Sequence, residues 1–163
     1  MRRVVLALGS VLFTVTLHAQ DPERRLSTPV VLAHARVSYG ASATAVTPGG
    51  KLVLDAVITP TVGVHIYAPG AKNYKPVAFT LDPVKGVTPG RTTYPSSELV
   101  IFAGELVPVF QRRFRLTREI TVAKTLKPGT SIRLTGTISY QACDEKLCYE
   151  AESAPVSWTV RVK

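Results

Sequence analysis

The feature that most constrains this chain is a two-residue alternation of apolar and polar side chains, repeated in short runs over most of its length. Alternate side chains of a strand point to opposite faces, so each run predicts a strand with one buried face. Prolines and glycines punctuate the runs, and no useful length of sequence beyond residue 20 repeats with the helical period. This pattern predicts an all-β, immunoglobulin-like β-sandwich in a single domain.

We expect strands at residues 31–39, 52–58, 62–68, 77–81, 114–122, 131–142 and 155–162, and two shorter ones within residues 98–110. Residues 86–97 contain Pro89-Gly90 and Tyr94-Pro95, which predict a loop with little regular structure. The apolar residues of the last strand are out of phase with those of the strand before it. This mismatch predicts a bulge or break near residues 153–155.

The N-terminus has the pattern of a signal peptide. Met1-Arg2-Arg3 precedes an apolar run at residues 4–17, and small residues follow near a cleavage point after Ala19. The run is shorter than the roughly 20 residues that a membrane span needs. We therefore expect a signal peptide at 1–19, a flexible mature N-terminus at 20–30 and the immunoglobulin-like domain at 31–163. The mature chain is expected to be soluble, not membrane-spanning, and periplasmic or otherwise exported.

The chain is basic, with a formal net charge of +9 that becomes +7 without Arg2 and Arg3. Export and the lack of a basic run interleaved with aromatic residues argue against nucleic acid as a partner. The densest basic segment, residues 111–116, alternates arginines with Phe114 and Leu116, as a strand with one solvated face does. At most, the charge steers an acidic partner.

The chain has two cysteines, Cys143 and Cys148, separated by four turn-compatible residues and flanked by predicted strands. A hairpin of this length places the two cysteines opposite each other, about 4.5 or 5.5 Å apart at Cα. A disulfide requires roughly 4.4–6.8 Å, so the bond can close without much backbone movement. Two cysteines in an exported chain suit an oxidising compartment.

The residues alone leave two interpretations of this bond open. As a staple it would close a loop of about six residues, for which chain entropy predicts only about 2 kcal/mol of stabilisation. Cys143 falls on the polar face of its strand, so its sulfur is expected to point away from the main core and to be accessible for exchange. The bond is therefore either a redox centre or a structural staple in a secreted domain.

The string from Tyr140 to Asp144, closed by Cys148-Tyr149, resembles the active-site hairpin of the N-terminal periplasmic domain of the disulfide reductase DsbD. Segments in the same order at residues 48–51, 63–67 and 94–105 extend the resemblance over residues 37–162. The resemblance implies an immunoglobulin-like fold and thiol–disulfide exchange without a cofactor. Two departures stand out: one residue fewer between the cysteines, and Glu150-Ala151 where the family usually has prolines.

The same resemblance assigns site residues. It implies that Cys143 and Cys148 are catalytic, with Cys148 forming the mixed disulfide and Cys143 resolving it. Tyr67 matches an aromatic residue beside the disulfide, whereas His65 departs from the family's aromatic residue. His65 either lies near the cysteines or faces solvent.

Three further residues complete the candidate site. Phe102 resembles the aromatic tip of a cap loop over the disulfide, although Val100 and Ile101 replace the acidic residues that precede it in the family. The alternative for Phe102 is a buried strand residue. Gln141 and Tyr149 belong to the hairpin string and are assigned supporting roles.

A metal site is not expected. Of the three histidines, His34 and His65 remain after cleavage, and further ligands at suitable spacing are lacking. We expect His34 to be a surface histidine.

The resemblance also implies partners. A thioredoxin-like protein would donate electrons, oxidised periplasmic thioredoxin-fold proteins would accept them, and a separate membrane thiol reductase is a further candidate. Full reductases of this family carry additional membrane and thioredoxin domains, so we expect the donor to be another protein. Whether the chain is an enzyme by itself is open, with a protein-disulfide reductase component favoured. The alternative from another class is a non-catalytic immunoglobulin-like binding or assembly module with a structural hairpin disulfide.

Overall fold

The computed structural model describes residues 26–102 and 104–163, so the predicted signal peptide and residues 20–25 lie outside it. Within these residues every regular element is a strand. The strands are β1 (Val30–Val31), β2 (Ala35–Ala41), β3 (Ala45–Val46), β4 (Lys51–Pro60), β5 (His65–Tyr67), β6 (Ala78–Leu81), β7 (Val87–Thr93), β8 (Glu98–Phe102), β9 (Glu105–Phe110), β10 (Phe114–Val122), β11 (Ser131–Tyr140), β12 (Ala142–Cys143) and β13 (Glu152–Val162). The described residues include no helix long and apolar enough to cross a membrane.

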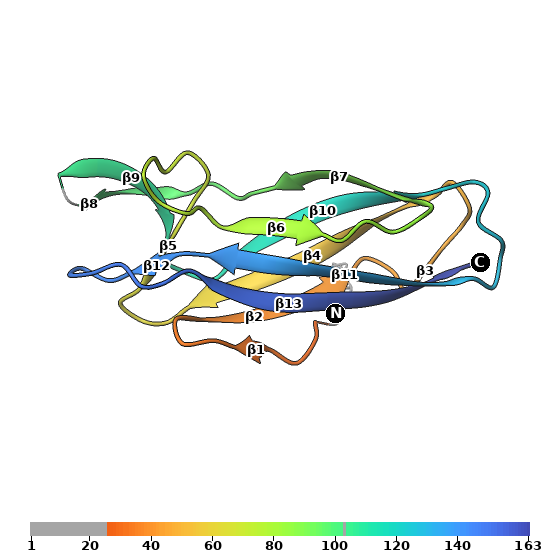
Figure 1. Ribbon diagram of the computed structural model, residues 1–163, viewed down its shortest axis with the longest axis horizontal. Coiled ribbons are helices and arrows are strands. Elements are labelled where there is room, and N and C mark those ends of the chain that lie inside the picture. The colour runs from red at the N-terminus through yellow and green to blue at the C-terminus, as the bar shows by residue number, and fades with distance from the viewer. Residues whose placement is uncertain (1–25, 103) are drawn as a thin grey trace, which may run out of the picture.

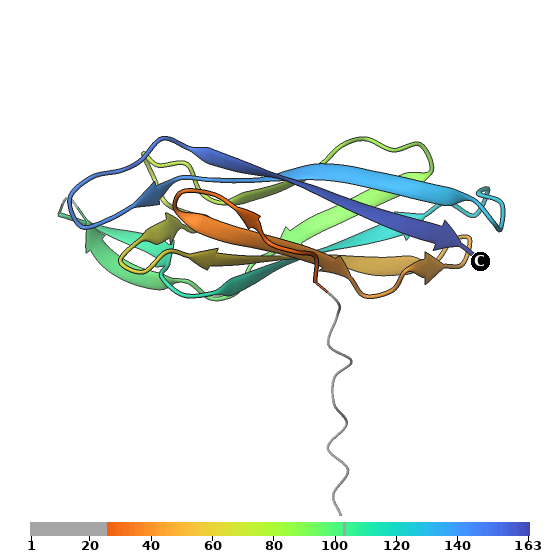
Figure 2. The same ribbon diagram turned by 90° about the horizontal axis from the view of Figure 1, so that it is seen from below.

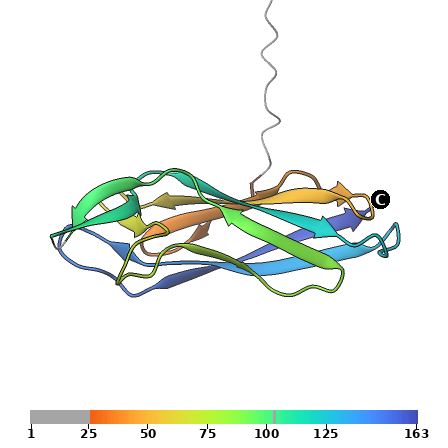
Figure 3. The same cartoon turned by 90° about the horizontal axis from the view of Figure 1, so that it is seen from above.

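Two sheets form the body of the molecule (Figure 1). One has the strand order β1-β2-β4-β10-β7 and the other β3-β13-β11-β6. Their ladders are antiparallel except for the short β3–β13 pair. Figures 2 and 3 show these sheets edge-on as two packed layers. The prediction of an all-β, immunoglobulin-like sandwich is confirmed.

The main core fills the space between the two layers. Alternate side chains of β4, β10, β11 and β13 are buried there, as their two-residue pattern predicts. Trp158 on β13 joins the layers, because its indole N–H donates a 2.7 Å hydrogen bond to the carbonyl oxygen of Gly40 on β2. Its ring also packs against Tyr39 and Phe79, with ring centroids 5.4 and 5.6 Å away.

The sequence prediction was wrong in three places. The expected loop at 86–97 contains strand β7, which pairs with β10 at the edge of its sheet. An edge position tolerates Pro89, and the ladder shifts register beside Gly90. The single strand expected at 31–39 is two strands, β1 and β2, which pair with each other. Residues at the start of the described chain also join this sheet, since the backbone N–H of Ser27 donates to Tyr39.

The third error concerns the register of the cysteine hairpin. The ladder between β11 and β13 is continuous from Ser131 to Tyr140, so it has no break at residues 153–155. The shift lies nearer the tip, where Tyr140 pairs with Glu152 but Cys143 is opposite Cys148. Between these two pairs, residues 141–142 therefore face residues 149–151. The strand β12 pairs with β5 instead of β13.

A third, smaller sheet lies at one end of the sandwich, opposite the end that carries the C-terminus (Figure 1). Its strand order is β12-β5-β9-β8. One face adds Ile66, Phe110 and Ala142 to the main core. The other face, with Tyr67, Val107, Val109 and Cys143, forms a second, separate cluster. The cysteines thus belong to this end sheet and not to the sandwich interior.

Candidate functional site

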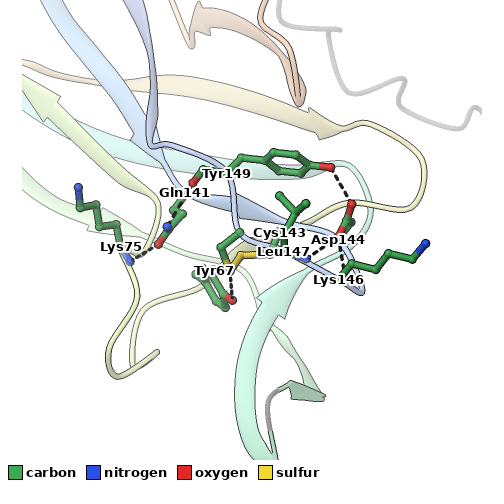
Figure 4. Close-up of a disulfide and its surroundings, with 9 residues drawn as sticks. Tyr67, Lys75, Gln141, Cys143, Asp144, Lys146, Leu147 and Tyr149 are labelled. Carbon is green, nitrogen blue, oxygen red and sulfur yellow. Dashed lines mark hydrogen bonds between the residues drawn. A yellow bond between two sulfur atoms is a disulfide. The ribbon is translucent and has the colours of Figure 1, made fainter.

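Cys143 and Cys148 form a disulfide at the tip of the hairpin, with Cα atoms 4.0 Å apart (Figure 4). They face each other across an isolated antiparallel bridge, as the spacing predicted. Cys143 is paired with His65 on β5, and this is the last pair of the β5–β12 ladder before the loop between the cysteines. The pair therefore sits where three segments meet: β12, β5 and the returning chain.

Asp144 holds the loop between the cysteines in shape. Its Oδ1 accepts hydrogen bonds from the backbone N–H groups of Lys146 and Leu147, at 2.7 and 2.8 Å. Its Oδ2 accepts one from the Tyr149 hydroxyl at 2.7 Å. This last bond and the two amides lower the pKa of Asp144 to about 2, and the bond to Asp144 raises the pKa of Tyr149. Sequence analysis did not single out Asp144, although an aspartate opening a short turn is a recognised loop signal.

The two cysteines differ in exposure. Cys143 is fully buried and Cys148 is partly exposed. The Cys143 side chain points away from the main core, as expected, but it enters the second cluster instead of solvent. The prediction that its sulfur is accessible was therefore wrong. Cys148 is thus the more exposed of the two bonded residues.

Tyr67 lies directly beside the disulfide. Its hydroxyl oxygen is 3.3 Å from Cys148 Sγ (Figure 4). Its ring stacks on Tyr74 with centroids 4.1 Å apart. Burial is the main cause that raises the pKa of Tyr67, so its hydroxyl stays protonated and can donate to sulfur. The predicted proximity of Tyr67 to the disulfide is observed. Tyr74, which lies in the loop before β6, was not singled out from the sequence.

Phe102 packs over the same cluster from the end of β8. It is partly buried, and its ring lies 5.5 Å from that of His65 and 6.0 Å from that of Tyr74, centroid to centroid. The cluster that it joins contains both cysteines. Phe102 is thus a partly buried strand residue that packs against the cluster of the two cysteines, and its role as a cap stays a prediction.

His65 is buried, with 8% of its surface exposed, so the solvent-facing alternative is excluded. Its Nε2 atom has no hydrogen-bond partner among the described residues. Burial lowers the pKa of His65, and the negative charge of Asp144 partly opposes this effect. The ring lies edge-on to Tyr67, with centroids 5.3 Å apart.

Gln141 connects the hairpin to a neighbouring loop. Its side-chain oxygen accepts a 3.2 Å hydrogen bond from the Lys75 backbone, and its side-chain nitrogen donates one of 3.2 Å to the carbonyl oxygen of Tyr149. Tyr149 in turn stacks on His34 with ring centroids 3.7 Å apart. His34 is therefore not a plain surface residue, since its Nδ1 is also 3.1 Å from Glu152 Oε2.

An open groove of about 780 Å³ runs along this end of the molecule. It is lined by the segment 63–65, the end of β8 at 100–102, Gln111, Arg112, and Glu145 and Lys146 of the cysteine loop. Of the large apolar side chains that are exposed in the described chain, Ile101 lines this groove, and Val62, Leu99, Leu106 and Leu147 belong to the neighbouring segments of the chain. In the described part of the chain no group of three or more histidine, cysteine or acidic residues is placed to hold a metal ion.

A scan against protein-family models and a sequence search of curated proteins give no match. Comparison with solved structures gives matches to the fold. The N-terminal periplasmic domain of ScsB from Proteus mirabilis matches with a TM-score of 0.58 and 11% identity, covering 85% of this chain and 52% of that one. The chain thus spans about half the length of that structure.

Two further matches have lower scores. The N-terminal domain of DsbD from Neisseria meningitidis, in the reduced form, matches with a TM-score of 0.47 and 15% identity over 77% of this chain and 85% of that one. The GAE domain of yeast GGA1 matches with a TM-score of 0.43 and 16% identity, covering 83% of this chain and 98% of that one. At these identities the likeness concerns the fold alone. The expected DsbD-like N-terminal domain fold is confirmed at that level, by the ScsB match.

Proposed function

We propose, from this fold and the placement of the disulfide, that the chain is an exported thiol–disulfide exchange domain. In this proposal it takes electrons from a thioredoxin-like donor and passes them to oxidised periplasmic proteins through Cys143 and Cys148. The observation that carries the proposal is the asymmetry of the bond. Cys148 is partly exposed at the hairpin tip, whereas Cys143 is fully buried in a small cluster with aromatic members.

This asymmetry supports a defined order of steps. A donor thiolate attacks Cys148 Sγ, the Cys143–Cys148 bond breaks, and its electron pair leaves on Cys143 Sγ. The donor's second thiolate then attacks the donor's first sulfur, which is bonded to Cys148, and Cys148 leaves as a thiolate. The donor is now oxidised, and after uptake of two protons this domain holds two thiols. Delivery to a substrate disulfide runs through the same steps in reverse.

The surroundings of the bond also favour exchange over a structural role. The loop closed by the bond is already fixed by the Asp144 hydrogen bonds and by the ladder beside it. The exposed apolar residues Leu99, Ile101 and Leu106 of the end sheet and Leu147 of the cysteine loop offer a partner a docking surface at this end of the molecule. Clusters of this kind on soluble proteins commonly mark interaction sites.

A redox titration tests the proposal. The protein is equilibrated in glutathione or thioredoxin buffers of graded potential, and free thiols are then alkylated and counted. A reduction potential in the range of known carriers, roughly −180 to −270 mV, supports exchange. A potential well below about −300 mV supports the alternative, a binding module with a structural disulfide.

Trapping identifies the partner class and the attacked sulfur. With Cys143→Ser the partly exposed Cys148 remains, and we expect a stable mixed disulfide with an exported thioredoxin-fold protein. The matched variant Cys148→Ser leaves only the buried thiol and is expected to trap little. Equal trapping by both variants would contradict the order of steps, and no trapping by either would contradict the exchange function.

A further inference from the structure

His65 is the one buried side chain whose nitrogen has no hydrogen-bond partner among the described residues. Buried polar atoms in native proteins are nearly always hydrogen-bonded, so an exception calls for an explanation. A simple packing role would be filled as well by the phenyl ring of a phenylalanine. The neighbours of the imidazole suggest a different role.

His65 lies opposite Cys143 in the end sheet. The two residues are direct partners in the antiparallel β5–β12 ladder. Directly opposed side chains project from the same face, with Cβ atoms about 4.5–5.5 Å apart. Tyr67, two residues along β5, projects from that face as well and reaches Cys148. One short strand thus presents an imidazole on the same face as Cys143 and a phenol beside Cys148.

Cys143 is the sulfur that requires help with a proton. When Cys148 is attacked, the electron pair of the broken bond leaves on Cys143, which would then be a thiolate in an apolar cluster. Burial in apolar surroundings raises the pKa of a thiol, so the charged form is disfavoured there. Bulk water has little access to this sulfur, because Cys143 is fully buried.

We propose that His65 exchanges a proton with Cys143 Sγ during thiol–disulfide exchange, a role that rests on the exchange function proposed above. As the Cys143–Cys148 bond breaks, the imidazolium form gives its proton to the departing Cys143 sulfur, which becomes a thiol. In the opposite direction the neutral imidazole takes the Cys143 proton while that sulfur attacks Cys148 Sγ in the mixed disulfide. The bond from Cys148 to the partner then breaks, and the partner leaves as a thiolate.

The protonation state of His65 fits this role. Burial lowers its pKa, so the ring is mostly neutral near pH 7 and ready to accept a proton. Other titratable or charged groups around it are Asp144, Glu145 and Lys146 on the cysteine loop, Arg112 after β9, and the Tyr67 hydroxyl on its own strand. His65 also lines the open groove, which gives its strand a route for proton exchange with water.

The test compares His65→Phe, which keeps an aromatic ring but cannot carry a proton, with His65→Gln, which can form hydrogen bonds but does not titrate. Single-turnover resolution of a mixed disulfide between Cys148 and a small thiol is followed against pH. We expect both variants to slow this step, on the order of 10²-fold as positioned proton transfer typically contributes. We also expect both to lose an inflection below pH 6.5 that the unmodified protein shows.

A second measurement does not depend on any redox partner. In a Cys148→Ser background, the ultraviolet absorbance of the Cys143 thiolate is titrated with and without His65→Gln. Loss of the imidazole is expected to move this titration to higher pH. The control variant His34→Gln is expected to leave the inflection in the pH profile of mixed-disulfide resolution in place. An unchanged rate, profile and thiol titration in the two His65 variants would overturn the proposal. Failure of the wild-type disulfide to react with a thioredoxin would instead overturn the exchange function itself.

Discussion

Reduction of the Cys143–Cys148 bond is predicted to weaken the fold only slightly. The bonded residues are five positions apart, and the chain-entropy relation assigns a loop of about six residues a stabilisation of about 2 kcal/mol. A loop of about a hundred residues would be stabilised by about 4.7 kcal/mol. For a domain of roughly 140 residues, 2 kcal/mol corresponds to a fall in Tm of about 7 °C. The main core lies between the two large sheets, so it is expected to survive reduction intact.

The assay is urea unfolding with and without dithiothreitol, followed by the fluorescence of Trp158, the single tryptophan of the chain. Trp158 is buried in the main core, so its signal reports the sandwich and not the hairpin tip. We expect the midpoint to fall while the slope of the free energy of unfolding against urea stays the same, as it does when only stability changes.

A Cys143→Ala/Cys148→Ala double variant without reductant is the matched control, and its midpoint is expected to coincide with that of the reduced protein. The reasoning fails if the reduced protein loses its cooperative transition. It also fails if the free energy of unfolding falls by more than about 4 kcal/mol, as for a bond that closes a long loop. Either result would mean that the disulfide holds the fold together, which an electron carrier that must stay folded in both states cannot allow.

Three further outcomes follow from the contacts described above. The pKa of Asp144 is lowered from 3.8 to about 2. The stabilisation that Asp144 gives the loop is therefore complete above about pH 4 and is lost as pH falls towards 2. The two loop amides bonded to Asp144 should show this titration by NMR, and Asp144→Ala should abolish it. Trp158→Phe removes the indole hydrogen bond to the Gly40 carbonyl and should lower the free energy of unfolding by about 1 kcal/mol, measured by circular dichroism. Tyr67→Phe removes the hydroxyl beside Cys148 Sγ and should raise the pKa of the Cys148 thiol in the reduced protein by about one unit, or about 1.4 kcal/mol, seen as slower alkylation near neutral pH.

The fold class was predictable because strand alternation is a local property that survives in the sequence. The errors arose where tertiary context decides. Pro89 and Gly90 have the composition of a loop, yet an edge strand accommodates both. The register shift was correctly inferred from the phase of the last strand but misplaced, because phase reveals that an extra residue exists without locating it.

The sequence predicted which residues form the site better than it predicted how buried they are. Spacing alone placed the two cysteines opposite each other, as they are. The burial of Cys143 was missed because side chains of the second cluster, among them Tyr74 and Phe102, cover this face of the end sheet. The setting of His65 was left open for the same reason, since its partner strand is distant in sequence. Single-strand periodicity cannot reveal a neighbour that covers the outer face.

The register shift between the Tyr140–Glu152 and Cys143–Cys148 pairs separates the length of the cysteine loop from the geometry of the sandwich. The long β11–β13 ladder ends at the Tyr140–Glu152 pair, and Asp144 to Leu147 belong to no strand. Residues inserted or deleted between the cysteines would change only this projecting segment and would leave every pairing of the large sheets as it is. An engineer can therefore vary the loop, and with it the ease of opening the bond, on an otherwise constant scaffold.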